Sequence, residues 1–212
     1  MKEYHKIETL FERDMAGTKK LIEGNFRSPA VEYLKDCRWS FTEKIDGTNI
    51  RVMWDGHKVT FGGRTDNAQI PAQLIAVLTE MFLGDANEQI FESMFGEKPV
   101  TLFGEGYGGK IQGGSLYRQD CSFAMFDAAV NGTFLYRDDI SGIAKPFGAA
   151  SAPLVFSGTI AQAVSYVKSR PLSKIAQNNL PMEGIVGVPD ARLFDHWGAR
   201  IIVKIKAKDF ES

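Results

Sequence analysis

A fold of mixed β-hairpins and helices is predicted by local patterns in the 212-residue sequence. Residues 50–54 alternate apolar and polar side chains, as a strand with one buried face does. Asp55-Gly56 is a good hairpin turn, after which residues 58–61 return as a second strand. Residues 71–83 carry apolar side chains at helical spacing and begin with a proline, which suits a first helical turn. We therefore expect both strands and helices.

Length and composition predict a single domain over residues 1–212. No Pro/Gly/Ser-rich linker or low-complexity tract divides the chain, and the hydrophobic fraction of 44% is ordinary for a globular protein. The formal net charge is −1, so the chain has no general basic character. Any surface that binds nucleic acid must therefore be a local patch.

Targeting signals and metal-site spacings are both missing from the sequence. Its start contains no apolar signal segment, and no later stretch approaches the length of a membrane span. Cys37 and Cys121 are the only cysteines, and neither they nor the three histidines have the spacing of a zinc site. We expect a cytoplasmic, intracellular protein with reduced thiols and no membrane attachment.

Two further helices are expected, and each follows a capping-box pattern. Asp85 and Glu88 have this pattern before the apolar positions of residues 90–95. Thr159 and Gln162 have it before a second apolar face. We interpret these helices as scaffold whose apolar side chains form the core.

Four more strands are expected in the second half of the chain. Residues 121–128 are apolar enough for a buried strand, and Asn131-Gly132 turns it into residues 133–136. Residues 182–188 resemble a strand loosened by glycines. Residues 200–208 alternate with a period of two, and the polar face carries three lysines: Lys204, Lys206 and Lys208. Such a row is also typical of edge-strand protection, so the pattern alone leaves both interpretations open.

A glycine-rich stretch follows the strand that begins at Val100. Residues 104–110 fit both Gly-x-Gly-x-x-Gly and Gly-x-x-x-x-Gly-Lys. Both matches fail on context, because Ile111 stands where a phosphate-binding loop has Ser or Thr and no helix pattern follows. The carboxylate of Glu105 would also repel phosphates. We do not interpret this stretch as a phosphate-binding loop.

Glu43 and Lys44 open the run Glu-Lys-Ile-Asp-Gly-Thr-Asn, which ends at Asn49. On spacing alone, a solvated charged turn is the simpler interpretation. The whole run resembles motif I of the covalent nucleotidyltransferases, and most closely that of the RNA ligase 2 group with the RNA-editing ligases. The resemblance implies that Lys44 attacks the α-phosphate of ATP and carries AMP as a phosphoramidate. It also implies that Glu43 and Asn49 belong to the nucleotide-binding site.

Other parts of the chain resemble further nucleotide-binding elements of this family. Arg64 follows two glycines and can present its guanidinium fork to a phosphate. An exposed loop arginine is the alternative, but in the family an arginine in this region contacts the AMP phosphate or the incoming end. Glu105 resembles motif III, whose glutamate contacts the ribose. Phe126 resembles the motif IIIa aromatic that stacks on adenine, with Phe123 as the second choice.

Motifs IV and V have matches near the end of the chain. Glu183, in Glu-Gly-Ile-Val, resembles the glutamate that the family uses at its catalytic metal, and a carboxylate suits Mg²⁺ or Mn²⁺. Lys204 and Lys206 resemble the motif V lysines that contact the α-phosphate. A nucleophilic lysine needs desolvation or nearby cations to lower its pKa, and this pair could supply them to Lys44.

The resemblance covers residues 43–206. It implies an α+β adenylyltransferase domain in which two antiparallel sheets with flanking helices surround an ATP groove. It also implies an ATP-dependent polynucleotide ligase, most consistent with RNA, that joins 3′-hydroxyl and 5′-phosphate ends through lysyl-AMP. RNA ends or a nicked duplex would be the substrate, with Mg²⁺ or Mn²⁺ as the metal.

Two alternatives remain: a DNA-nick ligase core, and a nucleotide- or nucleic-acid-binding module without catalysis. Lys44, Glu183 and the Lys204/Lys206 pair argue against the second. The sequence stops just after motif V, without the C-terminal oligonucleotide-binding-fold or helical domain of many relatives. We expect either a partner protein that supplies polynucleotide binding or a minimal ligase.

Overall fold

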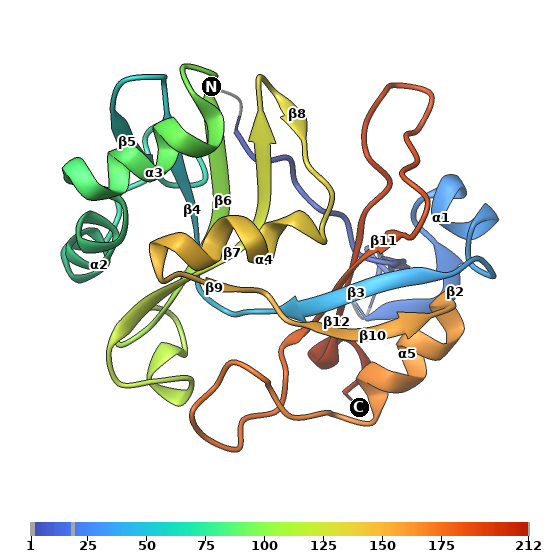
Figure 1. Cartoon of the computed structure of the whole chain (residues 1–212). Helices are drawn as coiled ribbons and strands as arrows, with labels where there is room; N and C mark the ends of the chain where they lie inside the picture. Colours follow the sequence, from blue (N-terminus) through green and yellow to red (C-terminus); the bar gives the residue numbers. More distant parts are fainter. Residues whose placement is uncertain (1–2, 18–19, 212) are drawn as a thin grey trace. The chain divides into compact units, whose positions relative to one another are not determined.

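The computed structural model describes residues 3–17 and 20–211 and divides the chain into two compact units. We call residues 46–152, with short pieces at 1–5 and 176–178, the middle unit. We call residues 6–45, 153–175 and 179–212 the terminal unit. Both combine antiparallel sheets with helices, so the expected α+β class is confirmed (Figure 1).

The middle unit contains one large sheet with the strand order β5-β4-β6-β7-β8. Neighbouring strands in this order are antiparallel, and β9 joins β7 in parallel. The elements are, in chain order, β4 (Thr48–Trp54), β5 (Val59–Gly62), α2 (Ala72–Phe82), α3 (Asp85–Phe95), β6 (Val100–Gly108), η1 (Gly114–Leu116), β7 (Cys121–Val130), β8 (Thr133–Phe134), α4 (Asp139–Ala144), η2 (Lys145–Phe147) and β9 (Ala150–Ser151).

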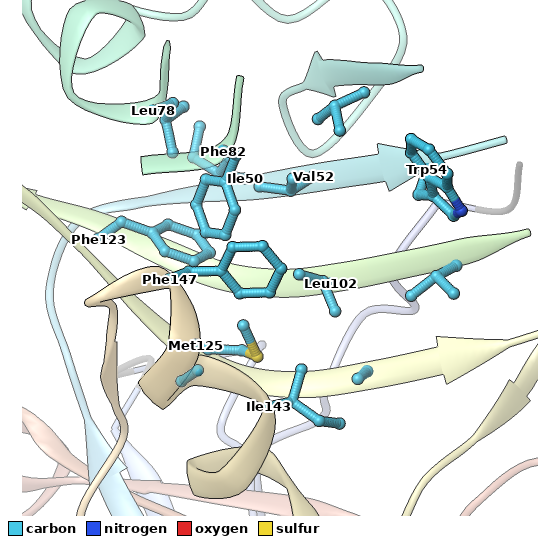
Figure 2. Close-up of a cluster of buried hydrophobic side chains, with 14 of the residues drawn as sticks. Ile50, Val52, Trp54, Leu78, Phe82, Leu102, Phe123, Met125, Ile143 and Phe147 are labelled. Carbon is cyan, nitrogen blue, oxygen red and sulfur yellow. The ribbon is translucent and has the colours of Figure 1, made fainter. Parts of the chain in front are cut away.

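One face of this sheet packs against helices and forms the core of the middle unit. The predicted alternation in β4 is confirmed, since Ile50, Val52 and Trp54 are all at most 3% exposed. Figure 2 shows the rings of Phe82 and Phe123 together in this core, and their centroids are 5.5 Å apart. Burying such a side chain contributes about 1.5–3 kcal/mol.

A β-bulge at Phe126 changes which residues of β7 face the core. Phe103 pairs with Asp127 and Gly104 pairs with Met125, so Phe126 is an extra residue without a partner in the register. An extra residue reverses the alternation and redirects a side chain, and bulges of this kind are common near functional sites. Phe126 is therefore displaced from the regular core-facing positions.

The glycine-rich stretch belongs to strand β6, which continues to Gly108 without a loop. A Cβ atom at Gly104 would lie 2.2 Å from the ring of Phe123, and one at Gly106 would lie 2.3 Å from Leu74. These glycines make room for core side chains. The rejection of a phosphate-binding loop is confirmed.

The terminal unit contains a four-stranded antiparallel sheet with the order β10-β3-β11-β12 and a separate β1-β2 pair. The elements are, in chain order, β1 (Phe11–Arg13), β2 (Leu21–Phe26), α1 (Pro29–Tyr33), β3 (Trp39–Lys44), β10 (Leu154–Gly158), α5 (Ile160–Lys168), β11 (Gly184–Pro189), β12 (Val203–Lys206) and η3 (Ala207–Phe210).

A second core lies on one face of the four-stranded sheet, where helix α5 packs. Phe41 of β3 and Ile185 of β11 are fully buried there with Ile160 and Ala163 of α5. The opposite face therefore receives the alternate side chains of each strand, among them Lys44, Lys204 and Lys206.

The two predicted capping boxes have different outcomes. At α5 the Thr159 hydroxyl accepts from the Gln162 backbone N–H, and the Thr159 N–H donates to the Gln162 side chain, which confirms the prediction. At α3 the prediction is wrong, because the helix already begins at Asp85 and its N-cap is Gly84, which has no side chain to cap it. Across the described ranges, no helix combines the length and apolar character needed to cross a membrane.

Candidate active site

Lys44, Glu183 and Lys206 meet where three strands of the terminal unit lie side by side. The register aligns Lys44 of β3 with Gly184 of β11, and Gly184 with Lys206 of β12. Lys44 Nζ lies 2.5 Å from Glu183 Oε2, and Lys206 Nζ lies 3.0 Å from Glu183 Oε1. One carboxylate thus binds two ammonium groups. The structure brings together residues predicted from motifs I, IV and V.

Lys204 adds a third amine to this group. It lies on the same face of β12 as Lys206. Its register partner is Val186 of β11, which in turn pairs with Thr42 of β3. Burial lowers the pKa of the Lys204 ammonium, and the positive charges of Lys206 and Lys44 lower it further. Lys204 is therefore electrostatically coupled to Lys206 and Lys44. Such a cluster of cations is suited to hold a phosphate.

Edge protection does not explain the lysines of β12. The outer side of this strand is already paired, because Lys204 N–H donates to Glu8 O at 3.1 Å and Leu10 N–H donates to Lys204 O at 3.2 Å. An exposed edge is what protective lysines guard, and here the edge is covered. Lys208 lies beyond the strand in η3 and is exposed, so the predicted row ends at Lys206.

Glu43 lies on the opposite face of β3 from Lys44, in the register position next to buried Ile185. Its carboxylate accepts hydrogen bonds from the Ser173 hydroxyl and, at 2.8 Å, from the Lys174 backbone N–H. Burial raises the pKa of Glu43, and these hydrogen bonds act in the opposite direction. Glu43 therefore holds the segment at 173–174, a role that the sequence did not predict. Its role in nucleotide binding stays a prediction.

Asn49 and Glu105 lie opposite each other on β4 and β6, on the face of the middle sheet that points away from the helices. Asn49 Oδ1 is buried and accepts no hydrogen bond from any residue that the structure describes. An unpaired buried oxygen is uncommon and marks a place where a ligand or water donates. The turn before β4 is equally constrained, since a Cβ atom at Gly47 would lie 2.2 Å from Gly106 O. These features fit a binding face without identifying its ligand.

Arg64 is exposed in the loop after β5, and buried Arg51 holds that loop. Arg51 is 1% exposed; its Nε donates to Gly63 O at 2.8 Å and its Nη2 donates to Asp66 Oδ1 at 2.7 Å. The sequence placed Arg51 on the polar face of β4 but gave no sign that its guanidinium is covered. The structure therefore identifies Arg51 as a residue that sequence reasoning missed.

The structure distinguishes between the two candidate adenine-stacking residues. Phe123 is fully buried among the side chains of the middle core, as Figure 2 shows. Phe126 is half-buried, and its ring meets Tyr4 edge to face at 5.2 Å between centroids. Only Phe126 retains surface for a ligand. The preference for Phe126 agrees with this geometry, and stacking on adenine stays a prediction.

Glu183 is the residue that fits a divalent metal. Among residues 3–17 and 20–211, no group of three or more His, Cys, Asp or Glu side chains could hold an ion. Mg²⁺ commonly takes one or two carboxylates and completes its shell with water and substrate phosphates. One carboxylate beside a cluster of phosphate-binding lysines fits that pattern. The protein residues alone do not form a complete metal site.

A model of the RNA ligase family matches residues 38–206. The chain belongs to the RNA ligase family. The matched span includes every predicted site residue from Glu43 to Lys206. Among curated protein sequences, none matches this RNA ligase family member.

Solved structures of the RNA ligase from Naegleria gruberi resemble this family member. One mutant with AMP and manganese is 17% identical with a TM-score of 0.65, over 86% of this chain and 53% of that chain. A mutant with ATP and manganese is 16% identical with a TM-score of 0.64, over 86% and 52%. A third, with AMP and manganese, is 15% identical with a TM-score of 0.65, over 97% and 62%. These similarities show the fold, and the chain spans just over half of those proteins.

Proposed function

We propose that this chain is an ATP-dependent RNA ligase that stores AMP on Lys44. The observation that supports it most is the convergence of the Lys44 and Lys206 amines on Glu183, at 2.5 and 3.0 Å, in a member of the RNA ligase family. A strong nucleophile, a phosphate-binding cation and a metal-binding carboxylate are the groups that nucleotidyl transfer requires.

The first chemical step joins Lys44 to AMP. The uncharged Lys44 amine attacks the α-phosphorus of ATP; the nitrogen–phosphorus bond forms as the bond to the β-phosphate oxygen breaks, and pyrophosphate leaves. Because lysine is ordinarily protonated at neutral pH, a proton must leave before the attack. Solvent takes up this proton, and Glu183 Oε2, which lies 2.5 Å from Nζ, holds the amine in place.

Lys204 and Lys206 stabilise the negative charge that develops on the α-phosphate oxygens. Fixed cations in a partly desolvated site do this without reorganising. Mg²⁺ or Mn²⁺, when bound, would add Lewis-acid polarisation of the phosphate. Glu183 would hold the ion, because hard cations prefer oxygen ligands. The Naegleria gruberi structures with ATP or AMP and manganese support this choice of metal.

Further residues are proposed to hold the nucleotide. Phe126 would stack on the adenine, and Glu105 would accept a hydrogen bond from the ribose. Asn49 and Arg64 would bind polar atoms of the nucleotide, and Glu43 completes the set that the family resemblance implies. We propose that residues 1–212 work as one adenylyltransferase domain.

Two later steps complete the joining reaction. AMP passes from Lys44 to the 5′-phosphate of an RNA end as the nitrogen–phosphorus bond breaks and a phosphoanhydride forms. A 3′-hydroxyl then attacks the activated 5′-phosphate, the phosphodiester bond forms and AMP leaves. RNA ends or a nicked duplex are the proposed substrates, with a partner protein as a second route to polynucleotide binding.

Transfer of label from ATP tests the first step. With Mg²⁺ and ATP labelled at the α-phosphate, the wild type should acquire acid-labile label, and Lys44→Ala should acquire none. Lys208→Ala is the matched control, because Lys208 is exposed outside β12 and should not be needed. A wild type that never takes label would favour a binding module without catalysis.

Joining assays test the choice of polynucleotide. Nicked RNA, nicked DNA and hybrid duplexes with 5′-phosphate ends are compared at equal concentration, and we expect RNA to be joined fastest. The Lys44→Ala variant should join none of them. Faster joining of DNA than of RNA would overturn the RNA assignment and favour a DNA-nick ligase core.

A further inference from the structure

A hairpin formed by residues 191–200 connects β11 to β12 in the terminal unit, and we call it the 191–200 hairpin. In Figure 1 this segment extends as a long, narrow loop beyond the two strands. Phe194 and Arg200 form an antiparallel bridge, and Ile201 N–H donates to Leu193 O at 3.2 Å. The motifs that define the site leave this segment without a function.

The tip of the hairpin has a fixed backbone. Asp195 Oδ1 accepts from the backbone N–H groups of Trp197 and Ala199, at 2.9 and 2.8 Å. Asp195 N–H donates to Ala199 O at 2.8 Å, and Gly198 has a φ of +76°, which suits glycine. A preorganised tip loses little conformational entropy when a ligand binds to it.

Large aromatic surface is exposed at this fixed tip. Trp197 is 82% exposed and Phe194 is 51% exposed. The rings of His196 and Trp197 lie 4.4 Å apart, and the Arg192 guanidinium lies 5.8 Å from the centre of the Phe194 ring. Exposed rings on a turn with a fixed backbone add nothing to the core, which leaves their faces available to a ligand.

The charges around these rings favour an anionic partner. Arg192 and Arg200 carry positive charge on the two arms of the hairpin. Two carboxylates, at the hairpin tip and just before its first arm, are held within the unit: Asp195 accepts backbone N–H groups through Oδ1, and Asp190 pairs with Arg38 at 3.0 Å and accepts from Ser40 at 2.7 Å. Aromatic rings beside arginines are suited to stack on bases and to contact phosphates.

We propose that the 191–200 hairpin binds single-stranded RNA, with Trp197 stacked on a base. This inference rests on the proposed function, because it assigns part of the polynucleotide contact to a surface outside the nucleotide-binding motifs. Stacking accepts any base, which suits an enzyme that joins ends of varied sequence. A protein partner is the alternative occupant, and RNA titration of Trp197 variants distinguishes the two.

Intrinsic fluorescence gives a direct readout, because the other two tryptophans are buried: Trp39 is 0% exposed and Trp54 is 3% exposed. Titrating a single-stranded RNA oligonucleotide into the wild type should quench the exposed tryptophan fluorescence. In Trp197→Phe the signal from Trp39 and Trp54 should not change on titration. Equal quenching in the wild type and in Trp197→Phe would overturn the proposal.

Affinity for the same oligonucleotide is measured by anisotropy of a labelled RNA. Trp197→Ala should weaken binding about tenfold, and Trp197→Phe should restore most of the affinity, since a ring can still stack. Tyr33→Ala is the matched control, because Tyr33 is 88% exposed in the same unit and should not contribute. Unchanged RNA affinity in Trp197→Ala, with or without a loss of binding to another protein, would overturn the proposal.

Self-adenylylation without RNA separates this inference from the proposed function. Trp197→Ala should take label from ATP at the wild-type rate while its KM for RNA rises about tenfold. If the wild type takes no label yet RNA still quenches Trp197, the proposed function fails and the binding surface stands. If labelling is normal and KM for RNA does not change in Trp197→Ala, the hairpin assignment fails alone.

Discussion

Glu183 holds together two positively charged side chains that would otherwise repel each other. Its two oxygens each bind one ammonium group, from Lys44 and from Lys206. The sequence could predict these residues because each belongs to a compact motif. It could not predict the Glu43 contact with Ser173, because the two residues are 130 positions apart and Ser173 lies in no motif. Arg51 was missed because its polar character predicted exposure and its partners, Gly63 and Asp66, lie 12 and 15 positions further along the chain.

Glu43→Gln tests the buried carboxylate through the pH dependence of stability. Burial raises the pKa of Glu43 in the folded state, so the folded protein binds more protons than the unfolded protein just above the ordinary glutamate pKa. The stability that protonated Glu43 contributes is therefore lost as pH rises through the folded-state pKa. Glutamine has the same size and carries no charge; its oxygen can still accept from the Lys174 backbone N–H, and its NH2 can donate to the Ser173 hydroxyl oxygen.

The free energy of unfolding is measured with urea from pH 4 to pH 7 for both proteins. We expect the wild type to lose stability relative to Glu43→Gln as pH rises. Contributions from the other carboxylates cancel in the difference. A difference that stays constant over this range would contradict a raised pKa at Glu43.

Strands were predicted better than their ends and irregularities. Alternation located β4 and the lysine face of β12 because side-chain direction follows directly from a period of two. The bulge at Phe126 could not be predicted, since an extra residue is defined only by the partner strand. The two predictions of helix starts had different outcomes. Thr159 caps α5 through its side chain, whereas the backbone at Asp85 is already helical.

Gly184→Ala tests how closely β11 and β12 must approach to build the site. A Cβ atom at Gly184 would lie 2.1 Å from Ile205 O and 2.8 Å from Lys206 Cα, so the strands would have to separate. We expect a loss of about 1–3 kcal/mol in the free energy of unfolding. Self-adenylylation should fall as well, because Lys206 would move away from Glu183.

Gly142→Ala provides the control for this substitution. Gly142 lies in helix α4, and a Cβ atom there would meet nothing within 4 Å. Alanine should stabilise that helix by about 0.5–1 kcal/mol and leave self-adenylylation unchanged. Equal stability and activity in Gly184→Ala and the wild type would show that strand spacing does not control the site.

For the whole molecule, the order of short motifs along the chain was more informative than bulk properties. Net charge and composition excluded a generally basic surface and indicated little else. Five motif resemblances between residues 43 and 206 predicted the family, which the match over residues 38–206 confirms. The expectation of a single domain stays a prediction, because the described chain forms two compact units. Long-range proximity depends on packing, which motifs do not encode.

Covalent attachment of AMP to Lys44 is the step on which the rest of the proposed reaction depends. Purified protein is incubated with ATP and Mg²⁺, digested under mildly alkaline conditions that preserve the nitrogen–phosphorus bond, and analysed by tandem mass spectrometry. We expect one AMP adduct, on Lys44, that pyrophosphate removes and that Lys44→Ala lacks. An adduct on a different residue, or no adduct on folded protein that binds ATP, would contradict it.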